Sequence, residues 1–308
     1  MSVLYRADRV RGRIWARVFA EQAPDLDFRT WPDAGDLAAV EYLVAWQPPS
    51  PFLQQLPNLK VLFSSGAGID HLDLSVVPED VTVVRMVEPG LVEGMVEYVT
   101  MSVLAIHRNL IDYMRAQAHG TWRALDVVPA TTRSVGVMGL GVLGKAVLRG
   151  LGAFGYRRYG WSRRLAEIPG VTCYAGAESL SEFLGHCDIL VCLLPLTAQT
   201  RGILDSRVMS ALPRGAWLIN VGRGAHLDEQ ALLDALEAGQ LSGAILDVFE
   251  PEPLPESHAF WRHPRIVVTP HIAAETQPET AAPLVLENIR RHRRGEPLRD
   301  VIDRHRGY

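Results

Sequence analysis

Three polar residues suited to proton exchange and carboxylate binding lie just past three apolar segments in the last third of the chain. The residues and the segments that they follow are Arg223 after Ala216–Val221, Glu252 after Gly243–Val248 and His271 after Arg265–Val268. These segments have the length and composition of buried strands. Because ligands bind outside the carboxyl ends of parallel strands, we expect the three side chains at one edge of a sheet.

Their chemistry is that of a carbonyl reduction. Histidine is the side chain best able to exchange a proton near neutral pH, and a neighbouring carboxylate would favour its imidazolium form. An arginine can bind a substrate carboxylate through two hydrogen bonds. Together these groups suit the reduction of a 2-keto acid, in which a hydride is added to the carbonyl carbon and His271 supplies the proton.

Each residue also has a structural alternative. Arg223 could be a turn residue, and His271 could cap a helix or pack in a core. Glu250 lies two positions from Glu252, and side-chain chemistry does not choose between them. Sequence spacing does not show that the side chains meet.

A glycine-rich loop predicts a dinucleotide site. The segment Ser134–Met138 has the character of a strand, and a helical pattern follows Gly144 up to Phe154. Between them lies GLGVLG, made of Gly139, Leu140, Gly141, Val142, Leu143 and Gly144. In this context the glycines permit a tight turn, close approach of a pyrophosphate and close packing of helix on strand. The alternative is a structural turn without a ligand.

The end of the next strand favours NADP(H), with NAD(H) as a second possibility. An NAD site has an acidic residue about 20 residues beyond the glycines, which binds the ribose hydroxyls. Here the sequence is Trp161, Ser162, Arg163 and Arg164, without a carboxylate. Two guanidinium groups suit the 2′-phosphate of NADP. The alternative is that both arginines are solvated surface charges.

The elements that must position these residues fall into two α/β lobes with parallel sheets. Residues 1–100 contain apolar runs bounded by Pro and Gly, and residues 132–270 alternate strand and helix. The spacing predicts one long amphipathic helix from Leu91 to Met114 between them, and a helix from Pro278 to Arg294. We expect a substrate lobe of residues 1–100 completed by 275–308, with a cofactor lobe of residues 101–274 inserted into it.

Composition restricts the class of protein. The chain has 308 residues, 48% of them hydrophobic, and a formal charge of −4, which excludes a disordered chain and offers no general attraction to nucleic acid or anionic lipid. No uninterrupted apolar run reaches the roughly 18 residues of a membrane helix, and the first residues lack a signal-peptide pattern. The three cysteines form no metal-binding pattern. We expect a cytoplasmic protein without metal, membrane or nucleic-acid partner.

The motifs resemble those of the D-isomer-specific 2-hydroxyacid dehydrogenase family over nearly the whole chain. The matching segments are GLGVLG at 139–144, LPLT at 194–197, NVGRG at 220–224, DVFEPEPL at 247–254 and TPH at 269–271. The resemblance implies that Arg223, Glu252 and His271 are the catalytic set, which selects Glu252 over Glu250. It also implies a homodimer and further cofactor contacts at Leu194, Pro195, Val221, Gly222, Asp247 and Ala273.

The resemblance extends to the predicted substrate lobe. The segment SSGAGID at 64–70 is similar to the family loop whose backbone amides bind the substrate carboxylate, with Gly66, Ala67 and Gly68 at its centre. An ordinary β-turn is the alternative. Three segments are most similar to those of the family members that reduce glyoxylate and hydroxypyruvate. They are AWQPP, which contains Trp46, WSRR and PHIAAET. Trp46 would then close over a small substrate.

Three functions therefore remain open. The first is NADPH-dependent reduction of glyoxylate and hydroxypyruvate to glycolate and D-glycerate. The second is an NAD-preferring dehydrogenase of a bulkier D-2-hydroxy acid. The third is a binding protein that senses nucleotide without turnover, as some relatives in the family do.

Overall fold

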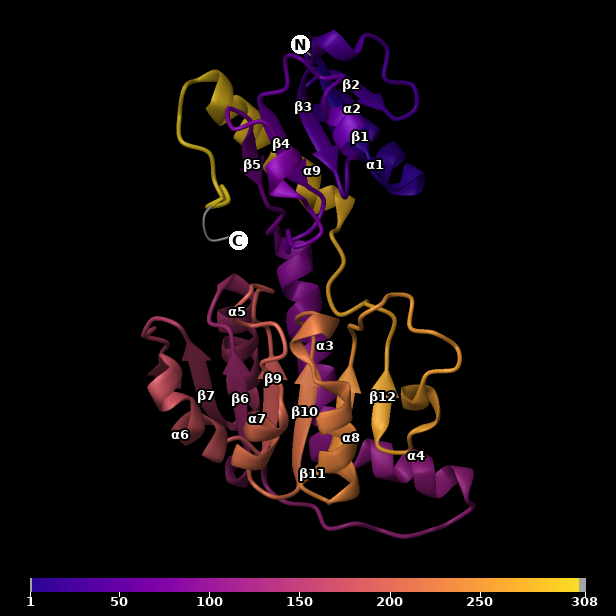
Figure 1. Ribbon diagram of the computed structural model, residues 1–308, viewed down its shortest axis with the longest axis vertical. Helices are drawn as coiled ribbons and strands as arrows, with labels where there is room; N and C mark the ends of the chain where they lie inside the picture. The colour runs from indigo at the N-terminus through magenta and orange to yellow at the C-terminus, as the bar shows by residue number, and fades with distance from the viewer. Residues whose placement is uncertain (1, 305–308) are drawn as a thin grey trace. The chain divides into compact units, whose positions relative to one another are not determined.

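The computed structural model describes residues 2–304, which form two compact units (Figure 1). The first unit contains the residues up to Val92 and those from Glu275 on, and the second is Glu93–Ala274. The chain changes unit inside the helix α3, Pro89–His107, somewhat before the boundary at residue 100 that the sequence suggested.

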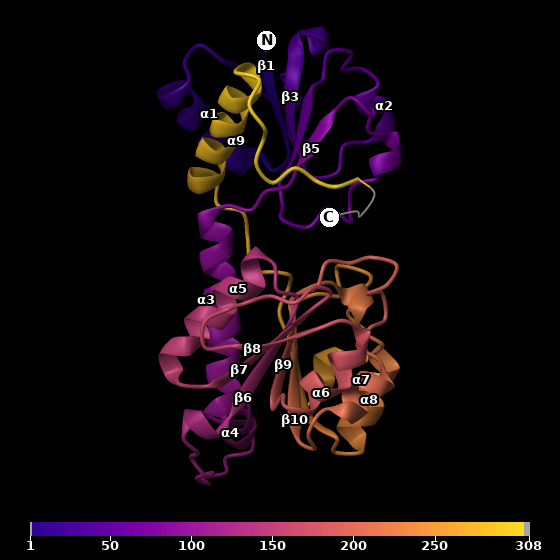
Figure 2. The same cartoon turned by 90° about the vertical axis from the view of Figure 1, so that its left-hand side faces the viewer.

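The first unit is a parallel sheet in the strand order β2-β1-β3-β4-β5. Its elements are β1 (Ser2–Arg6), α1 (Arg9–Gln22), β2 (Asp27–Thr30), β3 (Val40–Ala45), α2 (Ser50–Leu53), β4 (Val61–Ser64), β5 (Thr82–Val84) and α9 (Pro278–Arg293). Alternate strand residues point to opposite faces, so Val44 packs with α1 and α9 while Leu43 packs with α2. The helices α1 and α9 lie side by side although they come from opposite ends of the chain (Figure 2).

The second unit is a seven-stranded parallel sheet in the order β12-β11-β10-β9-β6-β7-β8. Its elements are α4 (Leu110–Ala118), β6 (Ser134–Met138), α5 (Val142–Leu151), β7 (Arg157–Ser162), β8 (Thr172–Ala175), α6 (Leu180–Gly185), β9 (Ile189–Cys192), α7 (Ser206–Ala211), β10 (Ala216–Asn220), α8 (Glu229–Glu237), β11 (Leu241–Leu246) and β12 (Ile266–Val268). Helices α3, α4 and α5 cover one face, and α6, α7 and α8 cover the other. The two parallel sheets confirm the predicted fold class.

The strand order reverses between β6 and β9, and this is the place where an open α/β sheet forms its ligand crevice. The loop after β6 begins at Gly139, and the loop after β9 begins at Leu193. The Leu193 amide donates a hydrogen bond to the Met138 carbonyl oxygen at 2.8 Å. The glycine-rich loop therefore lies at the reversal point.

The predicted helix from Leu91 to Met114 is wrong as a single element. It is divided into α3 and α4 at Asn109, whose φ of 57° lies in the left-handed region. Asparagine tolerates this conformation better than most residues, so an apolar periodicity can continue across a helix break. The sequence analysis also missed β1, α1, β2 and the edge strand β8.

Helix α3 has the length and mean hydropathy of a membrane span, although Glu93 and Glu97 interrupt its apolar run. The helix meets the criteria for a membrane span by its length and composition only. Of its most apolar 18-residue stretch, 39% is buried inside the protein. The core helix of a soluble protein passes the same test. Val99, Val103 and Ile106 of α3 are indeed in the core of the second unit.

A single buried carboxylate fixes the first turns of two helices in the first unit. Glu88 is fully buried, and its Oε1 accepts the N–H groups of Leu91 at 2.7 Å and Gln277 at 3.0 Å. Its Oε2 accepts the Gly90 N–H at 2.7 Å and the Thr280 hydroxyl. Because helix N-termini carry unpaired N–H groups and a positive dipole end, the carboxylate stabilises the starts of both α3 and α9.

Replacing Glu88 with Ala should lower the free energy of unfolding by about 3 kcal/mol, because buried donors lose a charged acceptor. Glu79 is exposed and serves as the control, since Glu79→Ala should change stability by less than about 0.5 kcal/mol. Urea unfolding followed by circular dichroism measures both. Equal stability of the two variants would contradict the assigned role of Glu88.

Candidate active site

His271 and Glu252 form a direct pair in the second unit. The His271 Nδ1 lies 2.7 Å from the Glu252 Oε2, and both side chains are about one-third exposed. The other oxygen of Glu252, Oε1, accepts the Phe249 N–H at 2.9 Å. With Nδ1 donating to the carboxylate, the Nε2 of His271 is the ring atom left to exchange a proton.

The structure also separates the two neighbouring glutamates. Glu250 forms an ion pair with Arg201 at 2.8 Å, and both side chains are more than half exposed. Glu252, from the same loop, faces His271 instead. Of the two glutamates, Glu252 is therefore the one in contact with His271.

The backbone of His271 is held by Asp247 and Thr269. The His271 N–H donates to the Asp247 carbonyl oxygen at 2.8 Å and contacts that of Thr269 at 3.1 Å. The Asp247 Oδ1 accepts the Thr269 hydroxyl at 2.6 Å and the Ile272 N–H at 2.9 Å, and its Oδ2 accepts the Ala273 N–H at 2.8 Å. These bonds hold His271 at a φ of 55°, which is uncommon for a residue other than glycine. Burial raises the pKa of Asp247, and the hydrogen bonds oppose this shift.

Tyr98 of α3 extends this network. Its hydroxyl lies 2.5 Å from the Thr269 Oγ1. Since the single hydroxyl proton of Thr269 goes to Asp247, the phenol of Tyr98 must donate to Thr269. Burial raises the pKa of Tyr98 to about 12, so the phenol keeps its proton at neutral pH. The sequence analysis missed both Tyr98 and Thr269 as supports, and a hydroxyl on an otherwise apolar helix face was the available signal.

The loop of Arg223 is fixed by buried polar side chains. Asn220 Nδ2 donates to the Arg223 carbonyl oxygen at 3.0 Å, and the Nδ1 of fully buried His226 accepts the Arg223 N–H at 3.0 Å. The Arg223 Nη1 donates to the Gly222 carbonyl oxygen at 2.8 Å. A Cβ on Gly224 would lie 1.9 Å from the Phe249 carbonyl carbon, so this loop touches the loop that carries Glu252.

The glycine-rich loop has the geometry of a phosphate cradle. A Cβ on Gly139 would lie 2.5 Å from the Leu193 carbonyl oxygen, and one on Gly144 would lie 1.9 Å from that of Gly139. Nothing lies within 4 Å of a Cβ on Gly141, the N-cap residue of α5, which provides no side-chain cap. Open space before an uncapped helix N-terminus fits an anionic pyrophosphate.

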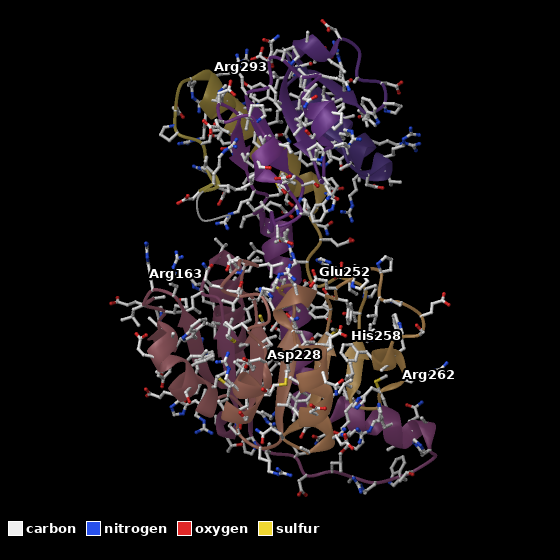
Figure 3. The ribbon with its side chains drawn as sticks, viewed as in Figure 1. Arg163, Asp228, Glu252, His258, Arg262 and Arg293 are labelled. Atoms are coloured by element: carbon white, nitrogen blue, oxygen red, sulfur yellow. The ribbon has the colours of Figure 1, made fainter. Side chains whose placement is uncertain are left out.

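Residues at the end of β7 differ in exposure. The Trp161 ring is largely buried in the core, and its Nε1 donates to the Gly176 carbonyl oxygen at 2.8 Å. The Ser162 hydroxyl donates to the Arg164 carbonyl oxygen at 2.6 Å. Arg163 and Arg164 are exposed, and Figure 3 shows Arg163 at the end of the sheet at which Glu252 also lies.

The other predicted cofactor residues follow neighbouring strands. Leu194, Val221, Gly222 and Ala273 are buried, whereas Pro195 is exposed and its carbonyl oxygen lies 3.3 Å from the His226 Nε2. Because Nδ1 of His226 accepts from Arg223, this Nε2 carries the proton and donates to Pro195. His226, which the sequence analysis missed, therefore connects the loops after β9 and β10.

The predicted substrate residues of the first unit lie after β3 and β4. Trp46 follows β3 and is 42% exposed, and Gly66 contacts the edge of its ring. The Gly66 carbonyl oxygen accepts the Met86 N–H at 3.0 Å, while its N–H lies 3.3 Å from the Ser64 Oγ. Ala67 and Gly68 are half-buried.

Neither metal binding nor thiol chemistry is indicated in the part of the chain that is described. Among residues 2–304, no three or more His, Cys, Asp or Glu side chains are arranged to hold a metal ion. Burial raises the pKa of the Cys187 thiol and raises that of Cys192 to about 12. Neither thiol is therefore activated as a nucleophile.

Comparison with known proteins identifies the family. The model for the D-isomer specific 2-hydroxyacid dehydrogenase, NAD binding domain, matches residues 100–273. The chain is 38% identical to the glyoxylate/hydroxypyruvate reductase A of Serratia proteamaculans over the full length of both proteins.

Two solved structures resemble both the sequence and the fold. A D-isomer specific 2-hydroxyacid dehydrogenase from Xanthobacter autotrophicus, in complex with NADPH and MES, is 39% identical, with a TM-score of 0.93 over 100% of this chain and 99% of that one. An NADPH-dependent glyoxylate/hydroxypyruvate reductase from Sinorhizobium meliloti, in complex with NADP and sulfate, is 37% identical, with a TM-score of 0.93 over 100% of both chains. The chain therefore belongs to the family of D-isomer-specific 2-hydroxyacid dehydrogenases, which are NAD(P)-dependent oxidoreductases.

Proposed function

We propose that this protein reduces glyoxylate and hydroxypyruvate to glycolate and D-glycerate with NADPH. The observation that carries the proposal is the pair of His271 and Glu252, with a 2.7 Å contact, at the sheet end that also carries the glycine-rich loop. The names of relatives 37–38% identical over the full chain support the choice of small 2-keto acids.

The cofactor, when bound, supplies a hydride to the carbonyl carbon of the substrate. Gly139, Gly141 and Gly144 let the backbone approach the pyrophosphate, and the first N–H groups of α5 bind it. Leu194, Pro195, Val221, Gly222 and Ala273 would hold the cofactor from the neighbouring loops, and Asp247 would support the segment beside its carboxamide.

His271 donates the proton that completes the hydroxyl group. Its Nε2 gives a proton to the carbonyl oxygen as the carbon gains the hydride, and Glu252 orients the ring by accepting a hydrogen bond from Nδ1. Arg223 binds the substrate carboxylate and polarises the adjacent carbonyl. In the first unit, backbone amides at Gly66, Ala67 and Gly68 bind the carboxylate, and Trp46 limits the size of the substrate.

The exposed arginines at the end of β7 account for the choice of cofactor. Arg163 and Arg164 bind the 2′-phosphate of NADP, and no carboxylate lies among residues 161–164 to repel it. The two structural relatives described above contain NADPH or NADP. A cytoplasmic location, pairing of two copies and the division of labour between the two units stay predictions.

Replacing Glu252 with Gln should lower kcat for glyoxylate by about 10²-fold, and His271→Gln should lower it by about 10²- to 10⁴-fold. Glu250→Gln is the matched control and should keep the wild-type rate, because Glu250 pairs with Arg201. Loss of NADPH absorbance measures turnover. Wild-type protein that binds NADPH tightly but turns over no 2-keto acid would contradict the proposal and favour a sensing function.

Replacing Arg163 and Arg164 together with Ala should raise the KM for NADPH by about 10- to 100-fold, because two charge-assisted contacts with the 2′-phosphate are lost. The KM for NADH should stay within about twofold, since NADH has no such phosphate. Arg149→Ala, at an exposed position on α5, is the control. An unchanged ratio of the two KM values would exclude these arginines from cofactor selection.

Replacing Thr269 with Val should lower kcat about tenfold and destabilise the fold by about 1 kcal/mol, because Asp247 and Tyr98 lose their shared hydroxyl. Thr269→Ser keeps the hydroxyl and should restore most of both quantities. A displaced His271 would also alter the pH profile of kcat, which a purely structural defect would leave in place. If Thr269→Val and Thr269→Ser have the same kcat and the same stability, the Thr269 hydroxyl does not hold the segment that carries His271.

A further inference from the structure

The indole ring of Trp46 is held along one edge by the substrate loop of the first unit. A Cβ on Gly66 would lie 2.6 Å from the Trp46 Cζ3 and 3.5 Å from both Cε3 and Cη2. An approach above the ring face would leave the neighbouring carbons much closer than this, so Gly66 meets the ring in its own plane. Glycine is needed here because any side chain would displace the indole.

One face of the same ring is held by His71. The ring centroids of Trp46 and His71 are 3.6 Å apart, and the planes differ by 12°. This is a stacked arrangement with the two rings in van der Waals contact. Trp46 nevertheless stays 42% exposed, so the indole is supported on one face and along one edge while part of its surface remains open to solvent.

The backbone at His71 is itself anchored in the core of the first unit. His71 lies between Ile69 and Leu72, which are 4% and 7% exposed and belong to the core of the first unit. The Leu72 N–H donates to the Ile69 carbonyl oxygen at 2.8 Å, which closes a turn around His71. The backbone that carries the imidazole is therefore anchored on both sides.

We propose that His71 is a specificity-determining residue that acts through Trp46. By supporting the face of the indole, His71 prevents the ring from tilting away from the loop at Gly66, and this limits the side chain of the 2-keto acid to small groups. The inference rests on the proposed function, in which Trp46 closes over the substrate. A smaller residue at position 71 leaves a gap behind the indole, into which the ring can rotate.

The test compares His71→Ala, which removes the supporting ring, with His71→Phe, which keeps a flat ring. The ratio of kcat/KM for phenylpyruvate to that for glyoxylate should rise about tenfold or more in the Ala variant, as expected when a pocket gains the space of a few atoms. In the Phe variant the ratio should stay within about threefold of wild type. His119→Ala, at an exposed position in the second unit, is the control for loss of a histidine.

Trp46→Ala should raise the same ratio, and adding His71→Ala to it should change little further, because both substitutions act on one barrier. Independent, additive effects would overturn the role of His71 in supporting the indole. An unchanged ratio in His71→Ala, with a raised ratio in Trp46→Ala, would show that Trp46 acts without this support.

Fluorine NMR of protein labelled with 5-fluorotryptophan tests the support without turnover. The Trp46 resonance, assigned by its absence in Trp46→Phe, should be a single line in wild type and His71→Phe and should shift and broaden in His71→Ala. A Trp46 line that is the same in His71→Ala as in wild type would overturn the inference. If the wild-type enzyme reduces no 2-keto acid, the proposed function fails, while these spectra still decide whether His71 holds the ring.

Discussion

The buried carboxylate of Asp247 holds together the part of the second unit on which the candidate chemistry depends. It accepts the Thr269 hydroxyl and the N–H groups of Ile272 and Ala273, while its own carbonyl oxygen accepts the His271 N–H. Leaving a buried carboxylate unpaired is costly, so these bonds fix one conformation of the segment after β12. The positive φ of His271 persists because this network over-determines it.

Close backbone approach is the second constraint. Gly144 packs against Gly139, and Gly224 packs against Phe249, at distances that no side chain would permit. The loops after β6, β9, β10 and β11 can therefore crowd together at the carboxyl end of the sheet. Rigid strands and buried loop anchors place the exposed His271–Glu252 pair, and a site of this kind needs such supports to keep its geometry.

Around Trp46, the first unit relies on ring stacking, whereas the segment of His271 in the second unit is held by buried polar groups. His71 and Trp46 are partly exposed, yet each is adjacent to residues or loops fixed in the core. Stacking of this kind restricts the motion of a partly exposed ring. In the proposed function, selection of small 2-keto acids then depends on His71 behind the ring as well as on Trp46.

The sequence by itself determined the parallel α/β class, the position of the glycine-rich turn and the candidate residues Arg223, Glu252 and His271, because period, glycine placement and strand ends are local properties. Tertiary structure decided which partners meet. It paired Glu252 with His271 and Glu250 with Arg201, broke the long helix at Asn109, and joined Tyr98 to Thr269 across 171 positions of sequence. Such contacts depend on strand order and on the packing of α3 against the sheet, which no local pattern of residues specifies.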